Sequence, residues 1–168
     1  MFERLDALEA PVCFRLVQAC QTPFIKQGFV FFSWLGNGPA WGVLLAYVLL
    51  NHDAQFGWSL TSVIAINALI YRYLKRYTVR RRPFVYRDDI TQGTRALDEF
   101  SFPSGHTLHA VGILVVLFAF APWAALSLLP IVLLIMASRV VLGLHYPSDV
   151  FVGAGLGIAV ANSILGFV

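Results

Sequence analysis

The sequence predicts an all-α, polytopic membrane helix bundle with about five transmembrane helices and an N-terminal amphipathic interfacial helix. Charged residues make up 12% of the 168 residues, whereas soluble domains contain about 25%. Hydrophobic residues make up 58%, and the mean hydropathy is +0.73. A water-soluble core of this size cannot bury so much apolar surface, so we expect the bilayer to be the solvent. By length, residues 1–168 are expected to form a single membrane-embedded domain.

The N-terminal segment, residues 2–20, is predicted to be an amphipathic helix that lies on the membrane surface. Its apolar residues recur at helical spacing, and charged residues fall between them. The apolar positions are Phe2, Leu5, Leu8, Val12 and Leu16, and the charged positions are Glu3, Arg4, Asp6, Glu9 and Arg15.

Five later segments are candidate membrane spans, because a span needs about 20 mostly apolar residues. In the first of them, Gly36-Asn37-Gly38-Pro39 predicts either a kinked helix or an interfacial helix followed by a short span. In the last, Gly153-x-x-x-Gly157 predicts close helix packing inside the bundle. The five segments are residues 29–50, 58–74, 104–121, 123–144 and 147–168.

Three short polar motifs follow or open these spans. An even number of crossings separates each motif from the next, so all three are predicted on the same side of the membrane. The motifs are Lys75-(six residues)-Arg82-Pro83, Pro103-Ser104-Gly105-His106, and Ser138-Arg139-(five residues)-His145-(three residues)-Asp149.

The first motif lies in a basic stretch, in which seven of the sixteen residues from 72 to 87 are Lys or Arg. Lys75 and Arg82 are two helical turns apart, so one face can direct both at the same anion. Pro83 favours an extended conformation at Arg82 and ends the helix there. Arginine offers phosphate a bidentate fork, and lysine adds a mobile positive charge. The other arginines are interpreted as a juxtamembrane cluster attracted to anionic lipid: Arg72, Arg76, Arg80 and Arg81.

The second motif is predicted to start a helix. Ser104 is a preferred N-cap, and the free N–H groups at a helix start form an anion site that Gly105 lets a ligand approach closely. A plain helix cap would explain Pro-Ser-Gly alone. His106 on an otherwise apolar span favours a functional role, because ionisable residues in membrane helices are usually functional. His109, one turn later, is interpreted as a packing or supporting residue.

In the third motif, His145 and Asp149 are four residues apart and would be neighbours on a helix that begins near Leu144. A carboxylate bonded to one imidazole nitrogen leaves the other free as a nucleophile. The alternative is a structural His–Asp pair. Arg139, near the end of a membrane helix, would be costly without a partner, and a bound phosphate is a natural one.

Together the three motifs resemble the signature motifs of the type-2 phosphatidic acid phosphatase superfamily, which also contains bacterial acid phosphatases and vanadium haloperoxidases. All eleven specified positions match in order and spacing. The membrane helices ally the chain with the integral-membrane lipid phosphatase branch, although many of its relatives have six spans. The resemblance implies a metal-independent phosphatase that uses a phosphohistidine intermediate.

The resemblance also implies a role for each site residue. His145 would be the nucleophile, Asp149 would orient it, and His106 would act as general acid and then base. The phosphoryl oxygens would be bound by Lys75, Arg82, Ser104, Gly105 and Arg139.

The substrate is expected to be a lipid, because a phosphate site in an apolar scaffold suits a phosphate head with an oily tail. Candidates are a polyprenyl diphosphate such as undecaprenyl diphosphate, phosphatidylglycerol phosphate, phosphatidic acid or a phosphorylated prenyl sugar. Alternatives are a lipid phosphotransferase and a non-catalytic lipid-phosphate binder. The bilayer and the phosphorylated lipid are the expected partners, with no nucleic acid, and the oligomeric state stays open.

No cofactor or metal site is expected, since the sequence has no HExxH motif and no Asp/Glu cluster, and its two cysteines are poorly spaced for a metal. The expected location is the inner or plasma membrane. The lipid phosphatases that the chain resembles mostly act at the periplasmic or extracellular face, and the active site is expected there. The positive-inside rule points the other way, because all twelve Lys and Arg residues fall on the motif side of the five-span arrangement.

Overall fold

The computed structural model describes residues 2–167, which form eight helices and no strand. One long loop, residues 87–104, joins the fifth and sixth helices. The helices are α1 (Glu3–Ala19), α2 (Pro23–Leu35), α3 (Gly38–Asn51), α4 (Ala54–Thr78), α5 (Pro83–Tyr86), α6 (Gly105–Phe120), α7 (Pro122–Val141) and α8 (Pro147–Leu165).

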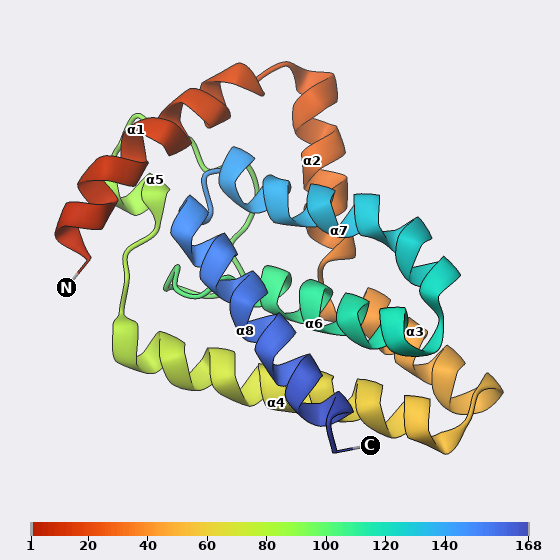
Figure 1. Ribbon diagram of the computed structural model, residues 1–168. Coiled ribbons are helices and arrows are strands. Elements are labelled where there is room, and N and C mark those ends of the chain that lie inside the picture. The colour runs from red at the N-terminus through yellow and green to blue at the C-terminus, as the bar shows by residue number, and fades with distance from the viewer. Residues whose placement is uncertain (1, 168) are drawn as a thin grey trace.

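Helix α6 is the centre of the bundle and packs against α4, α7 and α8 (Figure 1). Its contact with α8 is very close, because glycines of α8 face the backbone of α6. A Cβ added to Gly157 would lie 2.6 Å from Leu108 O, and one added to Gly153 would lie 2.8 Å from Ser104 O. The glycine pair therefore packs inside the bundle, as the sequence predicted, and it brings the start of α8 next to the start of α6.

The bundle is that of a multi-pass membrane protein, with fewer full-length spans than the five predicted. Within residues 2–167, three segments are long and apolar enough to cross a membrane: Ala54–Tyr86, Pro122–Val141 and Pro147–Leu165. Helices α2 and α3 are bent by 48° and count as one broken span. Helix α6 has 16 residues and is about 24 Å long, shorter than a hydrocarbon core of about 30 Å. Helix α6 is enclosed by other helices, and therefore little of its surface faces lipid.

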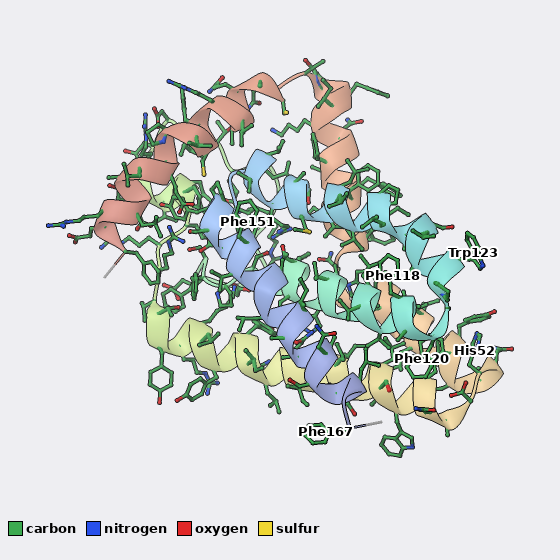
Figure 2. The ribbon with its side chains drawn as sticks, viewed as in Figure 1. His52, Phe118, Phe120, Trp123, Phe151 and Phe167 are labelled. Atoms are coloured by element: carbon green, nitrogen blue, oxygen red, sulfur yellow. The ribbon has the colours of Figure 1, made fainter. Side chains whose placement is uncertain are left out.

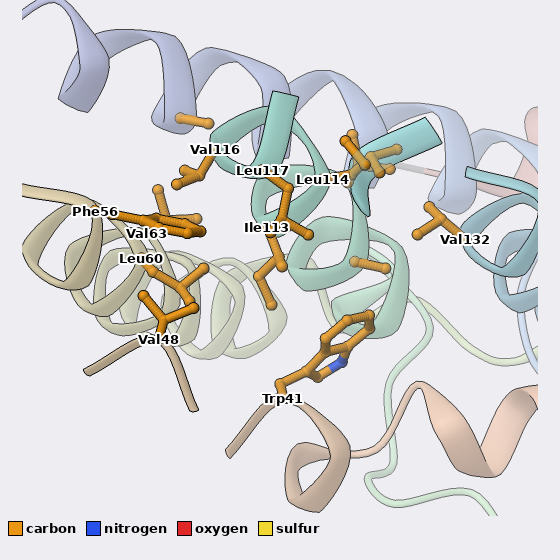
Figure 3. Packing of buried hydrophobic residues seen from close by; sticks show 14 of the residues in the cluster. Trp41, Val48, Phe56, Leu60, Val63, Ile113, Leu114, Val116, Leu117 and Val132 are labelled. Carbon is orange, nitrogen blue, oxygen red and sulfur yellow. The ribbon is translucent and has the colours of Figure 1, made fainter. Parts of the chain in front are cut away.

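The apolar core fills the half of the bundle around α3, α4 and α6. Figure 3 shows Trp41, Val48 and Leu60 converging on Ile113. At the far end of the bundle Phe56 and Phe120 stack with ring centroids 5.0 Å apart and planes at 6°. Figure 2 shows Phe120 at the same end as His52, Phe118 and Trp123, and Trp123 is exposed as expected for an interfacial aromatic residue.

Helix α1 has one exposed apolar face and one face that packs on the bundle. Its predicted apolar stripe is exposed, with Leu8 73% accessible, so this face is free to contact lipid. The opposite face packs on the domain and buries Asp6, Ala10, Cys13 and Val17. Two of the charged positions of this helix, Asp6 and Glu9, turn inward to the buried Arg80, which the sequence did not indicate.

Candidate active site

The three motifs meet at a cavity of about 270 Å³. It opens where α4 ends and α6 begins, next to the α7–α8 turn. Six of the eight predicted site residues line it: Lys75, Arg82, Gly105, His106, Arg139 and His145. Ser104 and Asp149 are fully buried behind the wall of the cavity.

Lys75 and Arg82 reach the cavity from different kinds of backbone. Lys75 lies in the last turn of α4, whereas Arg82 ends the non-helical segment 79–82 and has the extended backbone that Pro83 favours. Arg82 Nη1 donates to Leu144 O at 2.6 Å. This bond ties the first motif to the turn that carries His145.

Asp98, which sequence reasoning missed, reaches Lys75 and Arg82 from the long loop. Its Oδ1 accepts from Lys75 Nζ and, at 2.7 Å, from Arg82 Nη2. Burial alone would disfavour its negative charge, but the Lys75 ammonium and the Arg82 guanidinium outweigh burial and hold the pKa of Asp98 below its usual value. An ionised carboxylate thus occupies part of the cationic wall of the cavity.

Arg139 is the third buried cation that lines the cavity, and it has no carboxylate partner among the described residues. Its side chain is 2% exposed, and its Nη1 donates to Ser33 Oγ of α2. Its Nε makes no hydrogen bond within residues 2–167. A buried guanidinium without a counter-ion is costly, so this position is suited to an anionic ligand.

His145 is held between Arg82 and Asp149. Arg82 Nη1 lies 3.3 Å from His145 Nε2, and because a guanidinium can only donate, Nε2 is the acceptor. The ring proton is then on Nδ1, which faces Asp149 Oδ2 at 3.5 Å. That distance is at the outer limit for a hydrogen bond, and such contacts often shorten when substrate binds. The lone pair of the ring is therefore on Nε2, where Arg82 donates to it until substrate binds.

The surroundings of His145 also favour its neutral form. Burial lowers its pKa well below the usual value, and the positive charges of Arg82, Arg139 and Lys75 lower it further. A neutral imidazole keeps the lone pair that a nucleophile needs.

Asp149 is fixed from three directions. It is in the first turn of α8, and its Oδ2 accepts from Tyr146 N at 2.9 Å while facing His145. Its Oδ1 accepts from Arg80 Nη1 at 2.6 Å. The interpretation of Arg80 as a surface charge for lipid is therefore wrong: its side chain is 1% exposed, whereas Arg72, Arg76 and Arg81 are exposed.

The start of α6 supplies the second histidine. Ser104 Oγ accepts from Thr107 N at 3.5 Å, so this hydroxyl caps the helix. His106 Nε2 donates to Asn37 Oδ1 at 2.8 Å, and Asn37 lies in the break between α2 and α3. Gly36 permits this approach, since a Cβ there would lie 2.8 Å from His106 Cδ2. The sequence indicated the helix break but not its contact with His106.

No group of three or more His, Cys, Asp or Glu side chains in metal-binding geometry occurs among the described residues. The charged groups that line the cavity are mainly cations, which repel a metal ion and attract an anion.

The fold and this cavity define a multi-pass membrane protein with a cationic, histidine-containing site. Residues 56–168 match the family model of the PAP2 superfamily, and the chain belongs to that superfamily. The match includes all three motifs, so the family expected from the motifs is confirmed.

Three relatives agree with this assignment. The chain is 26% identical over 146 residues to an undecaprenyl-diphosphatase of Sulfolobus acidocaldarius, covering 86% of this chain and 71% of the relative. The crystal structure of Aquifex aeolicus LpxE superposes with a TM-score of 0.82 at 29% identity, covering 91% of this chain and 92% of the other. A transmembrane PAP2 type phosphatidylglycerolphosphate phosphatase from Bacillus subtilis shares the fold with a TM-score of 0.75 at 22% identity, covering 99% and 96%. The chain is thus a membrane phosphatase of the PAP2 superfamily.

Proposed function

We propose that this protein is an integral-membrane lipid phosphatase that hydrolyses a phosphomonoester or diphosphate on a lipid through a phosphohistidine at His145. One observation carries the proposal: a neutral histidine, backed by a buried carboxylate, lines a cavity that also contains the buried cations Lys75, Arg82 and Arg139. The unpaired buried charge of Arg139 supports an anionic substrate at the same place.

The first half-reaction transfers the phosphoryl group to the enzyme. Lys75, Arg82 and Arg139 bind the phosphoryl oxygens and stabilise the charge of the transition state. His145 Nε2 attacks phosphorus, the bond to the leaving oxygen breaks, and His106, in its imidazolium form, protonates that oxygen and becomes neutral. Asp149 keeps the proton on His145 Nδ1 and stabilises the positive ring that forms.

The second half-reaction restores the enzyme. His106, now without its proton, takes one from a water molecule that attacks the phosphohistidine, and inorganic phosphate leaves. With a lipid monoester the first product is a lipid alcohol, and with a lipid diphosphate it is a lipid monophosphate.

A lipid substrate is supported by the apolar surface beside the cavity. A second pocket of about 1040 Å³ is lined by Leu69, Leu74 and Leu156, and Arg72 lines both this pocket and the cavity. A phosphate head in the cavity would therefore leave its apolar chain room along α4. Undecaprenyl diphosphate, phosphatidylglycerol phosphate and phosphatidic acid are the substrates to compare.

We further propose that the active site faces the periplasm or the cell exterior. The basic residues of the motif side are the main objection, but the structure gives several of them other roles. Arg80 is buried in an ion-pair network, and Lys75, Arg82 and Arg139 line the cavity. Labelling of an Arg95→Cys variant in intact cells with a membrane-impermeant thiol reagent tests this: protection of the thiol until the cells are lysed would place the site in the cytoplasm.

The function itself is tested by phosphate release from the candidate lipids in detergent micelles, with EDTA and with vanadate. We expect turnover in EDTA and inhibition by vanadate, which mimics the five-coordinate transition state. His145→Ala should abolish turnover while lipid-phosphate binding persists, and Asp149→Asn should retain a residual rate because the nucleophile remains. Near-normal turnover by His145→Ala would exclude the phosphohistidine route.

The same assay separates the two alternatives. Suppression of free phosphate by an added acceptor lipid, with the phosphate recovered on that lipid, would identify a phosphotransferase. Binding of every candidate lipid without any phosphate release would identify a binding protein.

A further inference from the structure

Arg80 lies behind the candidate active site and makes polar contacts that the proposed reaction does not itself require. Its guanidinium is sandwiched by aromatic rings, with Cζ 4.1 Å from the Tyr146 ring centroid and 4.8 Å from that of Phe2. Its Nη1 donates to Asp149 Oδ1 at 2.6 Å and to Ser148 Oγ at 2.7 Å. The planar group is thereby held against the first turn of α8.

The other side of the same guanidinium is bound by α1. Arg80 Nε donates to Asp6 Oδ1 at 2.8 Å, and Nη2 donates to Glu9 Oε2 at 2.8 Å. Three carboxylates thus share one cation in a buried cluster. Burial raises the pKa of Asp6 despite its bond to Arg80, so this cluster depends strongly on the arginine charge.

Glu9 makes a second link from α1 to the start of α8. Its Oε1 accepts from Ser148 N at 2.8 Å, and its Oε2 accepts from Ser148 Oγ at 2.6 Å. A carboxylate at a helix N-terminus is stabilised by the free N–H groups and the helix dipole. Glu9 therefore fixes the residue that directly precedes Asp149.

We propose that Arg80 is a positioning residue for the reaction proposed above, and that with Glu9 and Asp6 of α1 it fixes the Asp149 carboxylate against the His145 ring. Arg80 itself does not line the cavity, so it acts through Asp149 and not on the substrate. The inference rests on the proposed function, because Arg80 would act through Asp149 on His145, the nucleophile of the proposed reaction. It also gives α1 a part in catalysis besides contact with the membrane.

The geometry predicts a loss in turnover without a loss in binding. The His145–Asp149 distance of 3.5 Å leaves little margin, and misplacement of a reacting group by about 1 Å can cost about 10²-fold in rate. The cations that would bind phosphate, Lys75, Arg82 and Arg139, are not touched by a change at Arg80. We expect Arg80→Gln to lower kcat by about 10²-fold, with an unchanged KM and unchanged inhibition by inorganic phosphate.

A purely structural role would give a different pattern, which a triple variant separates. Arg80→Gln leaves buried carboxylates without their cation, so it should lower the melting temperature in detergent. Adding Asp6→Asn and Glu9→Gln removes two of the three carboxylate charges and should recover most of the melting temperature without restoring kcat. Arg80→Lys should recover part of kcat, because an ammonium can pair with Asp149 but cannot bridge to α1 as a fork does.

The matched control is Arg81→Gln, which removes the neighbouring exposed charge and should leave kcat, KM and melting temperature unchanged. Recovery of kcat in the triple variant would show that Arg80 serves only to balance charge, and would overturn the proposal. An equal loss of phosphate inhibition and kcat in Arg80→Gln would also overturn it, since Arg80 would then be a ligand. If wild-type protein releases no phosphate from any lipid, the proposed function fails first, and the positioning role fails with it.

Discussion

The two ends of the bundle are formed by the same helices but differ in the side chains that they bury. At the motif end, charged side chains are buried in a connected network that runs from α1 through Arg80 and Asp149 to His145. At the far end, the α3–α4 and α6–α7 turns contain one charged residue, Asp53, which caps α4 by accepting from Phe56 N at 2.9 Å. Aromatic rings pack there: Phe56 stacks on Phe120 and meets His52 edge to face. Figure 2 shows His52 and Phe120 at this end.

The candidate active site is therefore at the charged end of the bundle, and the aromatic packing is at the other end. A buried charge is tolerated only where partners compensate it, so each group at the motif end constrains its neighbours. Stacked rings at the far end contribute packing and no charge, and a substitution there affects stability through lost contacts alone. Activity and stability should therefore respond to different ends of the molecule.

After loss of the nucleophile itself, the largest expected effect is at His106, whose role as acid depends on the leaving group. His106→Ala should lower turnover of a lipid phosphate by about 10² to 10⁴-fold, the usual contribution of general acid catalysis. The loss should be much smaller with an activated aryl phosphate, because its departing oxygen hardly needs a proton. The measurement is kcat for both substrates, with Asn37→Ala as a milder variant that frees the ring and leaves the proton donor. Equal losses on both substrates would remove the acid role.

Much of the site could be predicted because its residues follow local rules. The helix start at Ser104 and the extended residue before Pro83 each follow from backbone preferences within a few positions. The His145–Asp149 pair was expected on a helix beginning near Leu144, and that start is wrong: α8 begins at Pro147, and His145 faces Asp149 from the turn before the helix. The convergence of the motifs followed from counting membrane crossings, because α6 carries the chain away from the second motif and α7 brings it back to the third.

The missed residues depend on contacts between distant parts of the chain. Arg80 bonds to Asp6, 74 positions earlier, and no sequence periodicity connects them. A local signal did exist: residues two apart in an extended segment share a side, so Arg80 accompanies the buried Arg82 while Arg81 points outward. Asp98 had no such signal, because it lies in a long irregular loop whose path is fixed only by the folded bundle.

An intermediate effect is expected at the far end, on stability alone. Phe56 is 2% exposed and stacks on Phe120. Buried Phe→Ala changes typically cost about 3–5 kcal/mol, and Phe56→Ala should destabilise the bundle by no more than this. Its kcat should be unchanged at temperatures where the variant is folded. Melting in detergent measures this, with Phe151→Ala, a 73% exposed position, as the control that should melt like wild type. A selective fall in kcat would contradict the separation of the two ends.

The smallest expected effect is at Asp98, where the motif end holds a charge that competes with the substrate. The Asp98 carboxylate pairs with Lys75 and Arg82, the two groups proposed to bind phosphate, so an incoming phosphate must displace it. Asp98→Asn should strengthen inhibition by inorganic phosphate by about 3- to 5-fold, since a partly exposed ion pair is worth up to about 1 kcal/mol. Glu99→Gln, which changes the adjacent exposed carboxylate, should leave inhibition unchanged.

The pH dependence of that inhibition sharpens the same comparison. Lys75 and Arg82 keep the pKa of Asp98 below its usual value, so the ion pair stabilises the fold above the ordinary carboxyl pKa and is lost only as the pH falls through the lowered pKa. Between about pH 5 and pH 7 Asp98 therefore stays ionised beside its two cations, and the ratio of wild-type to Asp98→Asn inhibition constants should be constant. Phosphate inhibition measured across this range checks the prediction. Weaker inhibition in Asp98→Asn would mean that Asp98 holds the two cations in place for the substrate, and a ratio that changes with pH would mean that the carboxylate titrates within the working range.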